Sequence, residues 1–145
     1  MRPPPPASQL YVIDTSAQAR INLPDVRATI AGLIAQGVAA TCVTTDLEAG
    51  YSGRDGQEVE AISASRTSNY VVLHINEVIA ERARAVQRRM AVRGHHRAAG
   101  VIDLLTAAVA EYYGAVILHY DADFEHIAGI TNQPHAWILP RGSVS

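Results

Sequence analysis

Short apolar runs alternate with longer segments of helical periodicity along this chain. Runs rich in β-forming residues and bounded by polar residues predict strands at residues 10–13, 39–44, 70–73, 115–119 and 136–139. Helical spacing and capping residues predict helices at about 16–22, 24–36, 46–50, 58–67, 77–93, 101–113 and 123–129. The alternation predicts an α/β protein, a three-layer sandwich whose central sheet is mainly parallel and has four or five strands.

Several acidic residues fall where such a sheet gathers its ligands. Asp14 follows the first predicted strand and Asp121 follows the fourth, so both lie at carboxyl ends of strands. Glu48 lies in the helix after the second strand, and Asp103 lies near the start of a helix among apolar neighbours. A carboxylate in such surroundings is costly to bury without compensation. These positions, together with Asp123, predict a cluster of carboxylates.

A divalent cation would allow these carboxylates to coexist. Converging carboxylates repel one another, and hard oxygen ligands suit Mg²⁺ or Mn²⁺. Cations held in this way activate water and stabilise the charge of a phosphate, so the cluster predicts hydrolysis of a phosphodiester. Taken singly, each acid also fits an ordinary role. Asp14, Asp121 and Asp123 can serve as cap or turn residues, Asp103 as a helix-start acid and Glu48 as an exposed helix acid.

Composition narrows the class of protein. The chain has 145 residues and a formal net charge of -2, and every basic residue apart from histidine is arginine. It has a single cysteine, Cys42, in an apolar run, so no internal disulfide can form and a buried, unreactive thiol is expected. No apolar run reaches the roughly eighteen residues of a membrane span and no signal peptide is seen, so a cytoplasmic protein is expected. We expect a flexible Pro-rich lead-in over residues 1–8, one domain over 9–140 and a tail over 141–145.

Four stretches of sequence resemble one family. They are residues 11–16 (YVIDTS), 43–48 (VTTDLE), 101–108 (VIDLLTAA) and 118–124 (LHYDADF). In this order they resemble the PIN-domain toxins of bacterial VapBC toxin–antitoxin modules. Residues 93–97 (RGHHR), 134–137 (PHAW) and 140–142 (PRG) resemble an actinobacterial-type subgroup of that family.

The resemblance implies a fold, an activity and a set of site residues. It implies a PIN-like sandwich, an endoribonuclease that uses Mg²⁺ or Mn²⁺, a homodimer, and inhibition by a cognate VapB-type antitoxin. The core acids would be Asp14, Glu48 and Asp103, with Asp121, Asp123 or both as the last acidic ligand. Thr15 or Ser16 would supply a supporting hydroxyl, and Thr106 would support Asp103. Asp46 departs from the pattern as an extra acid, either a helix cap or an added charge at the site.

A basic segment offers candidate contacts to RNA. Residues 82–97 contain six Arg and two His, and no acid lies in this segment after Glu81. This segment is either an RNA-binding surface or a solvated helix face, and Arg93, His96 and Arg97 are the expected substrate contacts. His119, at a strand end near the proposed site, is either another RNA contact or a packed edge residue. A DNA nuclease, a phosphatase and a non-catalytic RNA- or antitoxin-binding module are the alternative functions.

Overall fold

The fold is built on a five-stranded parallel sheet with the strand order β3-β2-β1-β4-β5. The computed structural model describes residues 8–144. Its strands are β1 (Tyr11–Ile13), β2 (Ala39–Thr41), β3 (Val71–Val72), β4 (Val116–His119) and β5 (His135–Trp137). The predicted α/β class and sheet are confirmed, and every strand pairing in residues 8–144 is parallel.

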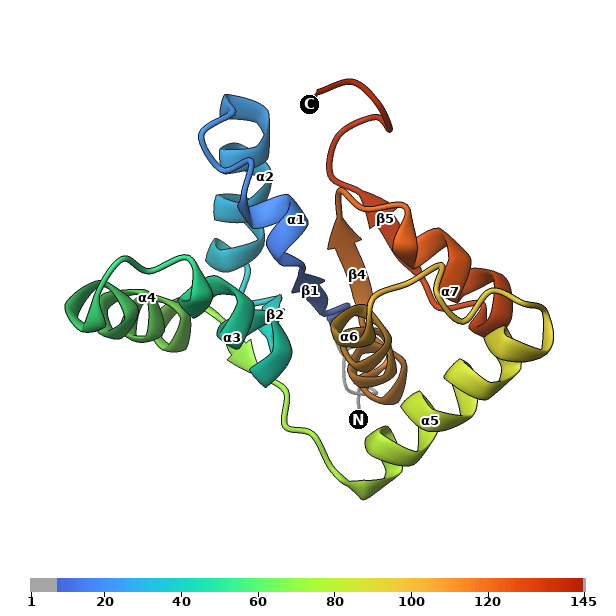
Figure 1. Cartoon of the computed structure of the whole chain (residues 1–145). Helices are drawn as coiled ribbons and strands as arrows, with labels where there is room; N and C mark the ends of the chain where they lie inside the picture. The colour runs from blue at the N-terminus through green and yellow to red at the C-terminus, as the bar shows by residue number, and fades with distance from the viewer. Residues whose placement is uncertain (1–7, 145) are drawn as a thin grey trace, which may run out of the picture.

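Helices lie on both faces of this sheet (Figure 1). They are α1 (Thr15–Gln18), α2 (Pro24–Ala35), α3 (Val43–Tyr51), α4 (Gly56–Asn69), α5 (Glu77–Val92), α6 (Val101–Tyr113) and α7 (Asp123–Thr131). None of the helices within residues 8–144 combines the length and hydrophobicity that crossing a lipid bilayer requires.

Alternating residues of the strands supply two separate cores. Val12, Ala40 and Ile117 pack with buried residues of α5, α6 and α7 on one face of the sheet. Their sequence neighbours Ile13, Ala39 and Leu118 face the other way, onto α1 and α2. This alternation is the period of two that a strand imposes, and burial on both faces explains why the strands read as short apolar runs.

The strand order places a crevice between β1 and β4. The chain moves outward from β1 to β2 and β3, then returns to the other side of β1 for β4 and β5. The loops after β1 and β4 therefore diverge to opposite sides, and ligands of open parallel sheets bind at this kind of switch point. The fold alone thus directs attention to the residues after Ile13 and His119.

The start of α3 differs from its prediction. The second strand was expected to run to Thr44, but β2 ends at Thr41 and α3 begins at Val43. Cys42 occupies the N-cap position, where its N–H donates to Oγ1 of Thr45 at 3.2 Å and Oγ1 of Thr45 donates back to its carbonyl at 2.9 Å. Thr44 and Thr45 have a high β propensity, but in the structure the hydroxyl of Thr45 closes the first turn of α3.

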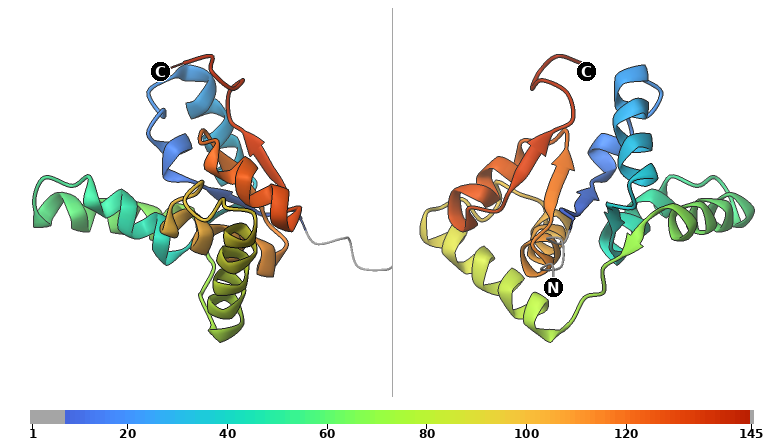
Figure 2. Two further views of the ribbon diagram at one scale, coloured as in Figure 1. Left: turned by 45° about the vertical axis from the view of Figure 1, so that its right-hand side comes forward. Right: turned by 180° about the vertical axis from the view of Figure 1, so that it is seen from behind.

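Helices α3 and α4 form a pair that projects from the rest of the molecule, as Figures 1 and 2 show. Helix α4 begins after Asp55, whose side chain accepts from the N–H of Glu58 at 2.8 Å, and it is longer than predicted at both ends. A partly buried ion pair anchors the helix, because Nε of Arg66 lies 2.7 Å from Oδ1 of Asp46 on α3.

The structure describes most of the expected C-terminal tail but only the last residue of the expected N-terminal lead-in. The expected lead-in over residues 1–8 lies, apart from Ser8, outside the described residues. Residues of the expected tail contact the domain: Arg141 pairs with Glu125 of α7 at 2.7 Å, and the hydroxyl of Tyr120 bonds both backbone groups of Val144 at 2.8 and 3.0 Å.

Candidate functional site

Asp14 forms the centre of the site at the switch point. It is 2% exposed and caps α1, because its Oδ2 accepts from the N–H of Ser16 at 3.0 Å and from the Ser16 hydroxyl at 2.5 Å. That hydroxyl also accepts from the N–H of Tyr120, after β4, at 2.9 Å. Ser16 therefore joins the ends of the two strands that flank the crevice.

Glu48 and Asp103 complete a first group of carboxylates with Asp14. One oxygen of each lies within 4.8 Å of the others. Glu48 comes from the middle of α3, where its Oε1 accepts from the hydroxyl of Thr15 at 3.2 Å. Asp103 comes from the first turn of α6. Three segments far apart in the sequence thus meet at one point.

A second group shares Asp103 and adds the two acids that follow β4. Oxygens of Asp103, Asp121 and Asp123 also lie within 4.8 Å of one another. Oδ1 of Asp121 accepts from the N–H of Asp123 at 2.9 Å, and Oδ2 of Asp123 accepts from the N–H of Gly100 at 3.1 Å. All five acids predicted from the sequence are therefore brought together, and Asp103 belongs to both groups.

Burial and mutual repulsion raise the pKa values of Asp14, Glu48 and Asp103. Desolvation, a hydrogen bond with Asp123 and the charges of neighbouring carboxylates raise the pKa of Asp103 to about 8. Desolvation also raises the pKa of Asp14, although its hydrogen bonds from Ser16 act in the opposite direction. Desolvation and the charge of Asp14 raise the pKa of Glu48. Asp103 therefore retains a proton at a pH where a carboxyl group in water would have released it.

The donor set fits a divalent cation. Oδ1 of Asp14 is buried without a hydrogen-bond partner within residues 8–144, although Oδ2 of the same carboxylate accepts two hydrogen bonds. A buried acceptor without a partner is costly, and a cation among the carboxylates would relieve both this cost and their repulsion. Because all donors are oxygens, the set resembles sites for hard cations rather than for zinc.

The supporting residues have different placements. Thr15 and Ser16 contact Glu48 and Asp14 directly. Within residues 8–144, Thr106 forms no hydrogen bond with Asp103. It donates to the carbonyl of Ile102 at 3.0 Å, and its Oγ1 lies 2.7 Å from Oγ1 of Thr44. Thr106 therefore ties α6 to α3, the helices that carry Asp103 and Glu48.

Asp46 is separate from the site. It belongs to neither group of carboxylates, and its Oδ1 instead accepts from Arg66 at 2.7 Å and from the hydroxyl of Thr41 at 2.6 Å. It is neither an added charge at the site nor the cap of α3, a position that Cys42 holds.

The candidate RNA contacts also separate into two kinds. Arg93, His96 and Arg97 are exposed, at the end of α5 and in the loop toward α6. His119 is 0% exposed, and this burial contradicts the expectation that its side chain contacts RNA. Desolvation and the neighbouring His135 lower the pKa of His119 to about 4. The other reading, a packed residue at the strand end, is correct.

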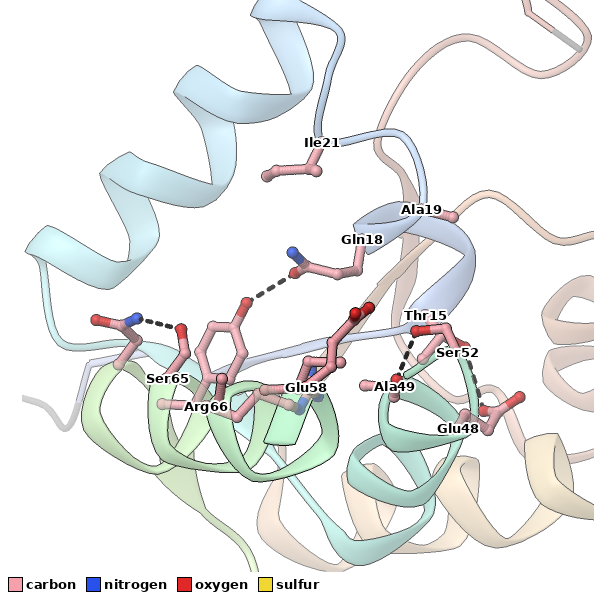
Figure 3. Close-up of a pocket in the computed structure, with 14 residues that line it drawn as sticks. Thr15, Gln18, Ala19, Ile21, Glu48, Ala49, Ser52, Glu58, Ser65 and Arg66 are labelled. Carbon is pink, nitrogen blue, oxygen red and sulfur yellow. Dashed lines mark hydrogen bonds between the residues drawn. The ribbon is translucent and has the colours of Figure 1, made fainter. Parts of the chain in front are cut away.

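A groove adjoins the carboxylates, and sequence reasoning did not find it. It has a volume of about 620 Å³ and lies between α1, α3 and α4 (Figure 3). Thr15 and Glu48 line its end at the site, and Ile62, Arg66 and Tyr70 are among the residues lining it farther along. Its residues come from segments more than 50 positions apart, so no local pattern could have indicated it.

The sequence comparisons agree with this geometry. The model of the PIN domain matches residues 11–130, most of the chain. The chain belongs to the PIN-domain family. The matched segment contains every acid of the site, whereas β5 and the bonded tail of this PIN domain lie beyond it.

Curated relatives match this PIN domain over most of its length. Ribonuclease VapC21 of Mycobacterium tuberculosis is 37% identical over 133 residues, covering 92% of this chain and 96% of the relative. Ribonuclease VapC51 of the same organism is 39% identical over 134 residues, with the same coverage. Ribonuclease VapC18 of that organism is 35% identical over 138 residues.

Solved structures share the fold of this PIN domain at low sequence identity. VapBC2 from Rickettsia felis, bound to a DNA fragment of its promoter, superposes with a TM-score of 0.73 at 13% identity, covering 88% of this chain and 98% of that one. DNA-bound VapBC from Salmonella typhimurium gives 0.72 at 18% identity, covering 91% and 100%. At these identities the likeness concerns the fold alone.

Proposed function

We propose that this PIN domain is a metal-dependent endoribonuclease, the toxin of a type II toxin–antitoxin module. The observation that carries the proposal is the meeting of Asp14, Glu48, Asp103, Asp121 and Asp123 in two groups that share Asp103. Relatives that are 37% and 39% identical over nearly their whole length bear the name ribonuclease, which supports RNA as the substrate.

The chain's own residues would hold Mg²⁺ or Mn²⁺ and the phosphodiester. A bound divalent cation supplies water of lowered pKa and a positive charge beside the phosphate. Asp14, Glu48 and Asp103 would hold the cation from the first group, and Asp121 and Asp123 would reach it through the second group, which shares Asp103. Hydrolysis would form a bond between a water oxygen and phosphorus and break one P–O ester bond. The carboxylate group would take a proton from the water, and the leaving oxygen would take up a proton from a carboxyl of that group or from solvent. The acids lie so close that they titrate together, so the group rather than one residue acts as the base.

The test compares the full-length protein with two site variants on a defined RNA. We expect cleavage with Mg²⁺ or Mn²⁺, loss of cleavage with a chelator, and a loss of at least a hundredfold in Asp14→Asn and Asp103→Asn. Asp25→Asn, at an exposed position of α2, is the matched control and retains activity. Full cleavage by either site variant would refute the proposal. Preferred cleavage of DNA of the same sequence would favour the alternative of a DNA nuclease, and metal binding without cleavage would favour a binding module.

We infer an antitoxin as the protein partner. The structures that this fold resembles include several toxin–antitoxin complexes. The groove beside Glu48 is a suitable docking surface, because Ala19, Ile21, Ala61 and Ile62 give it apolar walls and its end reaches the carboxylates. An occupant of this groove would cover Glu48 and so inhibit the enzyme. Ile62→Arg should abolish inhibition by the antitoxin without loss of RNA cleavage, as measured in mixed assays. Unchanged inhibition would place the antitoxin elsewhere.

We also propose a homodimer, in which a second copy of the chain covers another apolar surface. The surface consists of exposed side chains on α3 and at the start of α6: Val43, Leu47, Tyr51, Val101 and Ile102. Leu47 is 66% exposed and Tyr51 is 93% exposed, which is unusual for a set of apolar neighbours and is typical of an interface. Analytical ultracentrifugation should show a dimer that becomes a monomer in Leu47→Glu. A monomeric wild-type protein would contradict this assignment.

The basic surface at the end of α5 is the proposed path for RNA. Arg82 and Arg84 pair with Glu111 and Glu81, so they are partly neutralised. Arg93, His96 and Arg97 are exposed, and no acid lies between Glu81 and Asp103 in the sequence. Phosphate contacts release counterions, so Arg97→Gln should weaken RNA binding and reduce its dependence on salt. An unchanged salt dependence would exclude Arg97 from the path.

A further inference from the structure

Two imidazole rings lie next to the segment that carries Asp121 and Asp123, between the end of β4 and the start of α7. His119, the last residue of β4, is completely buried, and its ring lies 5.0 Å from that of His135 on β5. Nε2 of His119 and Nδ1 of His135 are 2.8 Å apart. The ring of His119 also packs against Phe124 and Trp137, with centroid distances of 5.0 and 4.9 Å.

The backbone fixes the proton on the buried ring. The N–H of Asp121 donates to Nδ1 of His119 at 3.0 Å. That nitrogen therefore carries no proton and accepts with its lone pair, and the ring is neutral with its proton on Nε2. Nε2–H in turn donates to Nδ1 of His135. Both nitrogens of His119 are thus used, which compensates the cost of burying a polar ring.

We propose that His119 is a positioning residue, whose Nδ1 holds the backbone of Asp121 and thereby orients the second carboxylate group toward the cation. This inference rests on the proposed metal-dependent function. Two further hydrogen bonds continue this arrangement. Oδ1 of Asp121 accepts from the N–H of Asp123, and Oδ2 of Asp123 accepts from the N–H of Gly100. His135 contributes by accepting from Nε2 of His119, which fixes the proton away from Nδ1.

Packing alone does not account for an imidazole at this position. The pocket between Phe124 and Trp137 is aromatic, and a phenyl or isobutyl side chain would fill it without any need for hydrogen bonds. What the imidazole adds is an acceptor aimed at the N–H of Asp121. Partners that orient metal ligands in this way commonly change metal affinity by about 10–100-fold when they are removed.

Two variants separate the acceptor from the packing. In His119→Asn the amide oxygen can take the place of Nδ1, whereas in His119→Gln the amide lies one bond farther out, close to Nε2. Both variants remove the ring, so both should lose similar thermal stability. In titrations of the full chain followed by Mn²⁺ electron paramagnetic resonance, we expect His119→Gln to bind Mn²⁺ at least tenfold more weakly than the wild type. His119→Asn should stay within about threefold of the wild type. Equal Mn²⁺ affinity in His119→Gln and wild type, or equal weakening in both variants, would overturn the proposal.

A measurement on the wild-type chain avoids any folding defect of the variants. Long-range ¹H–¹⁵N correlation spectra distinguish a protonated from an unprotonated ring nitrogen, and we expect Nδ1 of His119 to be unprotonated at neutral pH. A proton on Nδ1 would overturn the assignment. A wild-type chain that binds Mn²⁺ but cleaves no RNA would refute the proposed function alone, because the Mn²⁺ affinities and the position of the proton would still decide the role of His119.

Discussion

At the scale of single residues, the site is defined by carboxylates that are more buried than their charge favours. Asp103 is the clearest case, because desolvation and the neighbouring carboxylates raise its pKa from 3.8 to about 8. The two oxygens of Asp14 differ, one accepting two hydrogen bonds and the other accepting none within residues 8–144. These features make the stability of the protein depend on pH and on metal.

The raised pKa of Asp103 predicts how stability changes with pH in the absence of metal. A raised folded pKa means that the folded state binds a proton that the unfolded chain releases, so this stabilisation is complete below pH 3.8 and is lost as pH rises to about 8. The melting temperature in a chelator should therefore fall between pH 5 and pH 8.5. Asn resembles the neutral acid, so Asp103→Asn should flatten this fall, as differential scanning fluorimetry would show. A slope as steep as that of the wild type would contradict the pKa shift.

Ser16 predicts a coupled loss of stability and of metal binding. Its hydroxyl donates to Asp14 and accepts from the N–H of Tyr120, so Ser16→Ala removes both bonds. We expect a loss of about 1–3 kcal/mol in the free energy of unfolding, measured in urea, together with weaker Mn²⁺ binding. Ser63→Ala, on the exposed side of α4, is the control and should change neither quantity. Normal Mn²⁺ affinity in Ser16→Ala would show that Asp14 is held without this hydroxyl.

At the scale of elements, the sequence predicts the order and type of helices and strands because apolar runs and helical periodicity are local. The carboxyl-end positions of Asp14 and Asp121 follow from that order, and so does much of the candidate site. The errors lie where a side chain has two possible uses. Thr44 and Thr45 favour a strand by propensity, but a bond from the Thr45 hydroxyl to Cys42 begins α3 earlier.

The role of Asp46 could not be predicted because its partner, Arg66, lies 20 positions away on another helix. Asp46→Asn should weaken the contact between α3 and α4 and lower the free energy of unfolding by about 1–2 kcal/mol, since the pair is only partly buried. Mn²⁺ affinity, measured by calorimetry, should remain that of the wild type. A clear loss of Mn²⁺ binding in a folded Asp46→Asn protein would return Asp46 to the site.

The burial of His119 is a second feature that the local sequence could not predict. A polar residue at a strand end beside candidate ligands suggested an RNA contact, but the register of β4 and β5 sets its ring against Trp137 and His135. Burial at that point depends on β5, which lies after α7 in the chain and beyond the part that the PIN-domain family matches. Local pattern alone does not carry this information.

At the scale of the whole molecule, the acids of the site come from four separate places: the end of β1, helix α3, helix α6, and the segment from the end of β4 to the first residue of α7. Each place is held by contacts outside the site, such as Thr44 with Thr106 and Arg66 with Asp46. The fold therefore brings the carboxylates together and sustains their repulsion. A cation that neutralises them stabilises the folded chain as a whole.

Metal binding should accordingly be visible as global stabilisation. A ligand at about a hundred times its dissociation constant stabilises the folded state by about 2.7 kcal/mol. In a domain of this size that corresponds to a rise of about 5–10 °C in melting temperature. We expect Mn²⁺ to produce this rise in the wild type and to produce little in Asp14→Asn, because that variant lacks one of the proposed ligands. Without metal, Asp14→Asn should gain stability from the reduced repulsion among the carboxylates. Asp25→Asn should respond as the wild type does. A rise of equal size in Asp14→Asn would show that Mn²⁺ stabilises the protein from a site other than the carboxylates at the carboxyl ends of β1 and β4.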